Sequence, residues 1–283
     1  MVLRHTSHSQ HLQAATTMPS TNLVRGRSTK ILLLNPNSSQ SMTDGMNTVV
    51  NDISLPYSTE VYTYTAPPNA PASINDGDDI RASTDAVLAD FDDGGDAAAQ
   101  YQGILVACFS VHPLVRDLRR PGGAGPVVTG IFEASVLTAL SLLGPGQKWG
   151  IVTTGKFWED HLAHGVGAFL GAASPAAVDA KFAGVQSTGL NASDFHHGVD
   201  PAVVRQKMKA ATRRLLAAGN VHVIVMGCAG MAGLEDIIRE AASDEHGQEF
   251  AYAQLHVIDG VRAGIMQIDQ MIRNQHLRPG RNK

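Results

Sequence analysis

Short apolar runs alternate with longer amphipathic segments along most of the chain, which predicts alternating strands and helices. Strands are expected at residues 31–34, 61–65, 103–108, 126–130, 149–154, 181–186, 223–228 and 255–260. Helices are expected at residues 78–98, 132–143, 157–171, 200–218 and 261–277, with another after residue 230 and a helix or turn over 112–119. This alternation predicts an α/β fold with layers built on mainly parallel sheets.

Two of the predicted strands end at Cys108 and Cys228, the only 2 cysteines of the chain. Cys108 lies 73 residues after Asn35, and Cys228 lies 74 residues after Thr154, where Asn35 and Thr154 end two other predicted strands. These matching offsets predict an internal duplication, with two lobes that face each other. Ligands of open parallel sheets bind outside the carboxyl ends of the strands, so we expect both cysteines in one cleft.

The composition is consistent with a two-lobed α/β protein and argues against some classes of binding partner. The 283 residues are 43% hydrophobic and 17% charged, with a formal net charge of −4, which favours a globular protein that binds neither nucleic acid nor a membrane surface. No apolar run approaches the roughly 20 residues that a transmembrane helix needs. Two cysteines do not make a disulfide framework, so we expect reduced thiols and a cytoplasmic location.

Residues 1–29 differ from the rest of the chain. They are rich in Ser, Thr, His and Gln, and no acidic residue occurs before Asp44. Because apolar periodicity is absent, this segment is predicted to be a disordered arm. The alternative is a mitochondrial targeting segment, since Arg4, Arg25 and Arg27 occur there without acids.

The paired cysteines indicate proton-transfer chemistry. A helix that starts just after each cysteine would lower the pKa of its thiol from about 8.5 and bring it toward the range of a general base. The alternatives are a buried cysteine that only fills space, a disulfide between the two thiols, and a metal site. Two cysteines at repeat-related strand ends favour a functional role, and neither has a further Cys or His at the spacing of metal ligands.

Cofactor motifs are incomplete. Residues 150–156 resemble a phosphate-binding loop, but Phe157 stands where Ser or Thr should bind magnesium, and Leu170 breaks the glycine pattern that begins at Gly165. We therefore expect no nucleotide, no nicotinamide cofactor and no metal.

Three polar positions remain as weaker candidates. His112 follows Cys108 by four residues and is a candidate for tuning its thiol. Glu133 opens a predicted helix, where an acid suits either the helix dipole or a site. The pair His196-His197 is expected in an exposed loop.

With these motifs in hand, the chain resembles the aspartate/glutamate/hydantoin racemase superfamily over roughly residues 30 to 277. It is most similar to the hydantoin and allantoin racemase branch, including fungal members. The resemblance rests on Leu33-Leu34-Asn35-Pro36-Asn37-Ser38-Ser39, Pro71-Ala72-Ser73-Ile74, Val106-Ala107-Cys108-Phe109-Ser110, Pro126 to Glu133, Val152-Thr153-Thr154 and Gly227-Cys228-Ala229-Gly230-Met231.

The resemblance implies two pseudo-symmetric lobes with the site between them. The first lobe would comprise residues 30–131 plus 260–277, and the second residues 132–259. Cys108 and Cys228 would be a cofactor-independent acid/base pair. Substrate binding would fall to Asn37, Ser38, Ser73, Ile74, Phe109, Ser110, Thr153, Thr154, Ala229 and Gly230.

The chain departs from the family pattern at several positions. Amino-acid racemases of the superfamily open with an Asp-Ser pair where this chain has Asn35-Pro36-Asn37, which disfavours a free amino acid as substrate. Ala70, Asn75 and the run Val111-His112-Pro113 also depart from the branch and bear on the substituent of the ring.

These observations predict a homo-oligomeric racemase of 5-substituted hydantoins, with allantoin as the expected natural substrate. The alternatives are a thiol-dependent decarboxylase or cis-trans isomerase of the same superfamily, and a non-catalytic binding protein of nitrogen catabolism.

Overall fold

The computed structural model describes residues 28–55, 58–93, 97–120, 125–172, 174–195 and 198–275. The first sheet is formed by β1 (Thr29–Asn35), β2 (Thr59–Thr65), β3 (Gly103–Val106) and β4 (Val127–Gly130), and its helices are α1 (Gln40–Asn51), α2 (Gly77–Asp93) and α3 (Leu114–Asp117). The second sheet is formed by β5 (Lys148–Thr153), β6 (Phe182–Ser187), β7 (Val221–Met226) and β8 (His256–Asp259). The remaining helices are α4 (Ile131–Leu142), α5 (Phe157–Phe169), α6 (Pro175–Asp179), α7 (Pro201–Leu216), α8 (Glu235–His246) and α9 (Gly260–Gln275).

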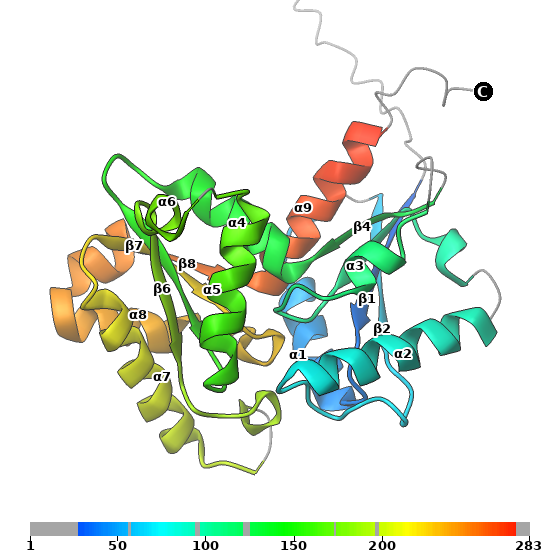
Figure 1. Cartoon of the computed structure of the whole chain (residues 1–283), viewed down its shortest axis with the longest axis horizontal. Helices are drawn as coiled ribbons and strands as arrows, with labels where there is room; N and C mark the ends of the chain where they lie inside the picture. The colour runs from blue at the N-terminus through cyan, green and yellow to red at the C-terminus, as the bar shows by residue number, and fades with distance from the viewer. Residues whose placement is uncertain are drawn as a thin grey trace, which may run out of the picture.

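The two sheets have the same topology. Their strand orders are β2-β1-β3-β4 and β6-β5-β7-β8, and every pairing within them is parallel. Each strand of the first sheet therefore has a counterpart four strands later in the chain. The predicted duplication and the α/β fold with two lobes are both confirmed, and Figure 1 shows the lobes side by side.

Helices α4 and α9 lie between the lobes. The two helices pack against each other (Figure 1). In addition, α4 packs against β7 and β8, and α9 packs against β3 and β4. Gly264 of α9 permits this close approach, because a Cβ atom there would lie 2.7 Å from the side chain of Leu105. The last helix thus crosses back to the first sheet.

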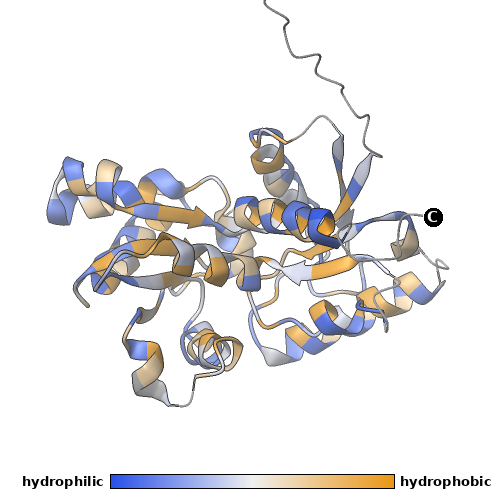
Figure 2. Ribbon diagram, turned by 90° about the horizontal axis from the view of Figure 1, so that it is seen from above, coloured by the Kyte–Doolittle hydropathy of each residue, from blue (hydrophilic) through white to orange (hydrophobic). Residues whose placement is uncertain are grey.

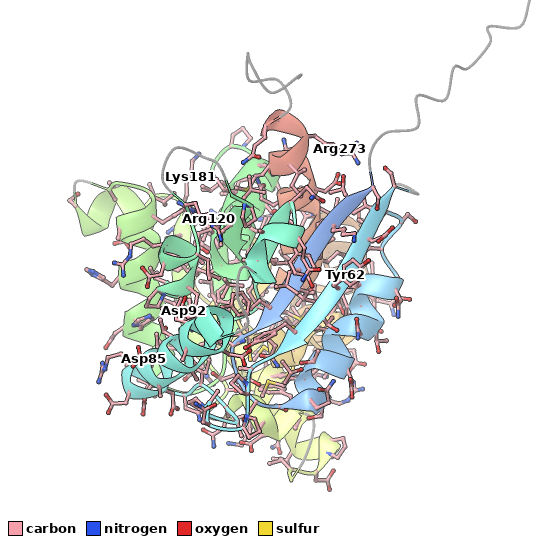
Figure 3. All side chains as sticks on the ribbon, turned by 90° about the vertical axis from the view of Figure 1, so that its right-hand side faces the viewer. Tyr62, Asp85, Asp92, Arg120, Lys181 and Arg273 are labelled. Carbon is pink, nitrogen blue, oxygen red and sulfur yellow. The ribbon has the colours of Figure 1, made fainter. Side chains whose placement is uncertain are left out.

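The central strands form the apolar core of each lobe. Leu33 and Leu34 of β1 and Trp149 and Ile151 of β5 are completely buried. Figure 2 shows apolar residues concentrated in the strands and polar ones on the outer faces of the helices. Charged residues such as Asp85, Asp92 and Arg273 are exposed on the outside of the molecule (Figure 3). Within the described residues, no helix is both long and apolar enough to cross a membrane.

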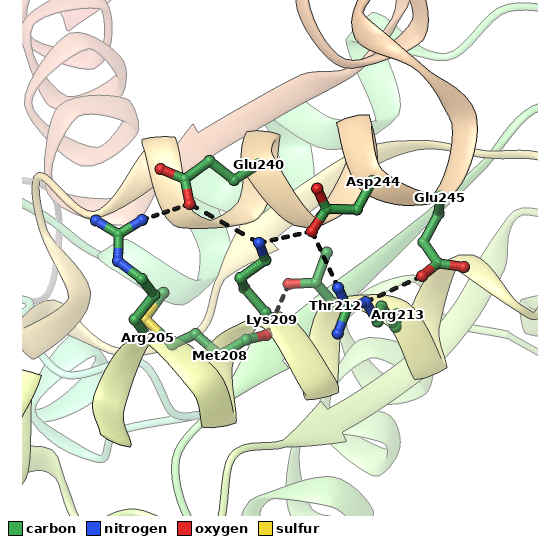
Figure 4. A network of polar contacts seen from close by, with 8 residues as sticks. All are labelled: Arg205, Met208, Lys209, Thr212, Arg213, Glu240, Asp244 and Glu245. Carbon is green, nitrogen blue, oxygen red and sulfur yellow. Dashed lines mark hydrogen bonds and ion pairs between the residues drawn. The ribbon is translucent and has the colours of Figure 1, made fainter. Parts of the chain in front are cut away.

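Ion pairs join α7 to α8 on the outer face of the second lobe (Figure 4). The network comprises Arg205, Lys209, Arg213, Glu240, Asp244 and Glu245, with Lys209 2.6 Å and Arg213 3.0 Å from Asp244. Exposed pairs of this kind each contribute about 0–1 kcal/mol. They fix the packing of two helices that lie on the outside of the lobe and take no part in the cleft.

Several element boundaries differ from the sequence prediction. The helix expected over residues 78–98 ends at Asp93, just before Gly94 and Gly95 in the sequence, and a short 3-10 helix (Ala97–Gln100) follows. Helix α6 and a π-helix (Phe250–Gln254) were not predicted. The strand predicted to begin at residue 31 begins at Thr29, and the predicted arm otherwise lies outside the described residues.

Candidate active site

A cavity lies between the carboxyl ends of the two sheets and is lined by both cysteines. Its lining comprises Asn37, Met42, Ile74, Ala107, Cys108, Phe109, Thr154, Trp158, Ala192, Gly227, Cys228, Ala229 and Gly230. The cavity volume is about 30 Å³, which is enough for one or two water molecules. A ring-sized ligand therefore enters only if the lobes or the loops around the cavity move apart.

Each cysteine occupies the same position relative to its sheet. Cys108 follows the end of β3 by two residues, and Cys228 follows the end of β7 by two residues. Both cysteines are free, and each residue as a whole is half-buried. The Cys108 sulfur lies 3.4 Å from the Ser110 hydroxyl, and the Cys228 sulfur accepts a hydrogen bond of 3.3 Å from the Gly230 N–H. The duplicated topology therefore brings two thiols to one cavity from opposite lobes.

The expected lowering of the thiol pKa values is wrong for this state of the site. Burial raises the pKa of Cys108 to about 12 and that of Cys228 to about 11. For Cys108 the Ser110 hydroxyl opposes the shift, and for Cys228 the N–H groups of Gly230 and Met231 do so. The dipole of a long helix is missing from both positions.

The local structure after each cysteine explains this result. After Cys108 the chain bends, and α3 begins only at Leu114. Cys228 is the N-cap of a 3-10 helix of three residues, Ala229–Met231. Neither element supplies the aligned peptide dipoles that the prediction required.

Six of the residues predicted to bind substrate line the cavity together with the cysteines. They are Asn37, Ile74, Phe109, Thr154, Ala229 and Gly230. Asn37 comes from the turn between β1 and α1, and Thr154 follows β5, so the two polar side chains come from equivalent strands of the two lobes. Ser39 caps α1 by accepting from the Met42 N–H.

The other four predicted residues are not among the described lining of the cavity. The Ser38 hydroxyl donates to the Ala70 carbonyl, and the Ser73 hydroxyl contacts the Asn75 side chain. Thr153 is buried and donates to the Gly227 carbonyl at 2.9 Å, which fixes the residue before Cys228. Ser110 is buried against the Cys108 sulfur. These side chains hold loops that carry lining residues.

His112 is buried in the first lobe and does not belong to the described lining of the cavity. Its ring contacts the Ser83 hydroxyl at 3.1 Å and accepts from the Leu114 N–H at 3.4 Å. Burial lowers the pKa of the imidazole to about 4. These contacts connect α2 to α3, so the role of His112 in this structure is to hold the two helices together. The pair His196-His197 lies outside the described residues.

Glu133 opens α4 close to Cys108 but does not line the cavity as described. Burial raises the pKa of its carboxyl group, opposed by the N–H groups of Glu133 and Gly130 and by Arg119. Its Oε2 atom is buried and, among the described residues, has no hydrogen-bond partner. Its negative charge contributes to the raised pKa of Cys108.

The sequence did not indicate five of the lining residues. Ala107 and Gly227 immediately precede the two cysteines, and their position could have been inferred from that adjacency. Met42 lies on the first turn of α1, Trp158 lies on α5, and Ala192 opens a 3-10 helix (Ala192–Phe195) that follows β6. Nothing in the apolar pattern distinguishes these three side chains from core residues.

The described lining contains no Asp, Glu, Lys, Arg or His. Its polar side-chain groups are the amide of Asn37, the hydroxyl of Thr154, the indole N–H of Trp158 and the two thiols. Among the described residues, no group of three or more His, Cys, Asp or Glu side chains is arranged to hold a metal ion.

Two equivalent α/β lobes with a cysteine from each in one cavity define a class of two-lobed proteins with paired thiols. The family model for Asp/Glu/Hydantoin racemase matches residues 31–268, and the chain belongs to this family. The prediction of a racemase-type isomerase is thereby confirmed at the level of the family.

Individual relatives agree with this assignment. The Schizosaccharomyces pombe protein C1F7.10 is 32% identical over 244 residues, which cover 86% of this chain and 92% of the relative. A hydantoin racemase from Rhizobium meliloti is 25% identical over 242 residues, covering 86% of this chain and 88% of the relative. Among solved structures, the allantoin racemase from Klebsiella pneumoniae has a TM-score of 0.68 at 22% identity, covering 88% of this chain and 89% of that one.

Proposed function

We propose that this protein racemises 5-substituted hydantoins, with allantoin as its natural substrate, by proton transfer between two cysteines. The observation that carries the proposal is that Cys108 and Cys228 line one uncharged cavity from opposite lobes. A planar ring between two thiols presents one face of its C5 carbon to each. The membership of the family and the named hydantoin racemase relative support the reaction class.

The proposed reaction moves one proton off C5 and another onto it. One cysteine, as thiolate, removes the C5 proton, and the electron pair of the C5–H bond moves into the ring to form an enolate. The opposite cysteine, as thiol, delivers its proton to the other face of C5 and becomes the thiolate. The two cysteines exchange roles when the other enantiomer reacts. Because the thiols supply both proton transfers, the proposed reaction uses no cofactor in either direction.

The uncharged lining supports a hydantoin over a free amino acid. A zwitterion carries an ammonium and a carboxylate, and burying either without a charged partner is costly. A hydantoin ring instead offers neutral N–H and C=O groups, which Asn37, Thr154 and the amides at Ala229 and Gly230 can pair. Stabilising the enolate oxygen by such donors lowers the barrier as charge develops.

The raised thiol pKa values predict the pH dependence of the reaction. Because both thiols titrate above neutral pH, the fraction of enzyme with one thiolate rises with pH. We expect kcat/KM for inversion to rise about tenfold per pH unit between about pH 6 and pH 8.5. Initial rates, corrected for spontaneous racemisation at each pH, check this slope. A maximum near pH 7 would show that a group with a lower pKa acts as the base.

Polarimetry tests the proposed function. The optical rotation of either pure enantiomer of allantoin should decay to zero with enzyme, faster than in buffer alone. L-glutamate, followed by polarimetry, is the control for an amino-acid racemase. Maleate and malonate are achiral, so they are followed by proton NMR as controls for a cis-trans isomerase and a decarboxylase. None of the three should react. Constant rotation of both allantoin enantiomers and of a second 5-substituted hydantoin would contradict the proposal.

A further inference from the structure

Two buried asparagine side chains stand at the end of β1, and only one of them lines the cavity. Asn35 is 1% exposed and Asn37 is 6% exposed. Asn37 borders the cavity, whereas Asn35 lies behind it and is not part of the described lining. Buried side-chain amides need hydrogen-bond partners, and the partners decide which way each amide points.

Backbone N–H groups fix the orientation of both amides, because an N–H can only donate. Asn37 Oδ1 accepts from the Ser39 N–H at 2.9 Å, and Asn35 Oδ1 accepts from the Asn37 N–H at 3.2 Å. The Asn35 amide nitrogen must then face the other way. Its two hydrogens are shared among three acceptors, namely Asn37 Oδ1 at 3.1 Å, the Ser39 carbonyl at 3.1 Å and the Thr43 hydroxyl at 3.0 Å.

These contacts leave the NH₂ group of Asn37 directed toward the cavity. Its one acceptor among the described residues is the Met42 sulfur at 3.3 Å, and Met42 also lines the cavity. A thioether is a weak acceptor. A carbonyl or enolate oxygen that entered the cavity would replace it as a much better partner for the same N–H.

We propose that Asn35 is a positioning residue that holds the Asn37 amide with its donor side toward the substrate oxygen on which negative charge develops. This inference rests on the proposed function for the identity of that oxygen, a ring carbonyl next to C5. The orientation itself rests only on the hydrogen bonds within the turn. Asn35 acts through Asn37 and does not touch the cavity.

The variant Asn35→Asp tests the proposal while keeping the shape of the side chain. The carboxylate can still accept from the Asn37 N–H, but its second oxygen meets the Asn37 Oδ1 acceptor instead of donating to it. Rotating the Asn37 amide relieves this repulsion at the expense of the hydrogen bond from the Ser39 N–H, and it turns the amide oxygen toward the cavity. Removing one donor to a developing oxyanion costs about 10²–10³-fold in kcat, and we expect a loss of that size with a smaller change in KM.

A pH readout tests whether the charge of the introduced carboxylate causes the loss of rate. At low pH the introduced carboxyl group becomes protonated and again donates to Asn37 Oδ1. The ratio of the variant's kcat to that of the wild type should therefore rise as the pH falls. The matched control is Thr65→Val, which removes a hydroxyl bonded to Thr43 and Gln40 in the same corner of the fold. It should keep kcat within about threefold, since no donor to the oxyanion is lost.

Side-chain amide signals in NMR spectra test the orientation without any substrate. The Asn37 NH₂ signals are assigned by their loss in Asn37→Asp. They should shift in ligand-free Asn35→Asp and stay in place in Thr65→Val. In the wild type, adding unsubstituted hydantoin, which is achiral and cannot be racemised, should also shift them.

The outcomes separate this inference from the proposed function. Unchanged Asn37 signals in Asn35→Asp would overturn the positioning role, even if the wild type racemises allantoin. Shifted signals in that variant, together with a wild type that neither binds hydantoin nor inverts allantoin, would uphold the orientation and overturn the proposed function. A kcat ratio that does not depend on pH would also contradict the positioning role.

Discussion

Replacing either Cys108 or Cys228 by serine is expected to lower the rate of inversion by at least about 10²–10⁴-fold, the usual contribution of a general acid or base. A hydroxyl group is far too weak an acid to form a useful base near neutral pH. Both cysteines line the cavity, and each is proposed to serve one face of the ring. Inversion needs both groups, so each single substitution should suffice to abolish it.

Exchange without inversion should survive in each variant. In deuterium oxide, Cys108→Ser retains Cys228, which can remove the C5 proton, exchange it for a deuteron of the solvent and return the deuteron to the same face of the ring. That variant should exchange the C5 proton of one enantiomer only, and Cys228→Ser should exchange that of the other. Proton NMR on each enantiomer measures this. If either variant inverts allantoin at nearly the wild-type rate, that cysteine has only a structural role.

The second large effect is expected at Gly227, the residue before Cys228. A Cβ atom there would lie 2.5 Å from the Ile151 side chain and 3.1 Å from the Val152 carbonyl oxygen. Gly227 also donates to that carbonyl at 2.7 Å and accepts from Thr153, so its backbone has little freedom to move. Gly227→Ala should destabilise the fold by about 1–3 kcal/mol, as overpacking of a core does.

The rate of inversion by Gly227→Ala should fall by more than its loss of folding stability alone would cause. Any backbone shift there moves Cys228, and a misplacement of about 1 Å costs on the order of 10²-fold in rate. Gly167→Ala is the matched control, because a Cβ atom in that helix meets only Val178, at 3.7 Å. It should leave the rate unchanged and raise the melting temperature slightly. Thermal unfolding and polarimetry measure both effects, and full activity of Gly227→Ala would show that this contact is not needed to place Cys228.

Most of the strands and helices could be predicted from the sequence, because apolar runs and their spacing are local features of the chain. Four-residue apolar runs such as 31–34 become buried strands, and the equal spacing from Asn35 to Cys108 and from Thr154 to Cys228 reflects the repeated strand order. The end of α2 was missed because the prediction carried the helix past Gly94 and Gly95 to the alanines at 97 and 98, although two adjacent glycines disfavour a helix. The π-helix at 250–254 has no comparable sequence signal.

The site was predictable only where its residues sit at strand ends. Cys108, Cys228, Asn37 and Thr154 follow strands, and a parallel sheet gathers such residues at one edge. Trp158 and Met42 reach the cavity from helices, and their placement depends on how the lobes pack. The thiol pKa values were predicted in the wrong direction because burial depends on the tertiary structure. Burial outweighs the Ser110 hydroxyl at Cys108 and the N–H groups of Gly230 and Met231 at Cys228.

Isotope incorporation during the first few per cent of conversion tests the two-thiol mechanism most directly. One pure enantiomer of allantoin is incubated with the wild-type enzyme in deuterium oxide, and the two enantiomers are then separated and analysed for C5 deuterium. If one cysteine removes the proton and the other delivers a deuteron, the product enantiomer carries deuterium while the remaining substrate keeps protium. Starting from the other enantiomer should give the mirror result. Equal deuterium in both enantiomers from the outset would mean that a single group serves both faces, and would contradict the account.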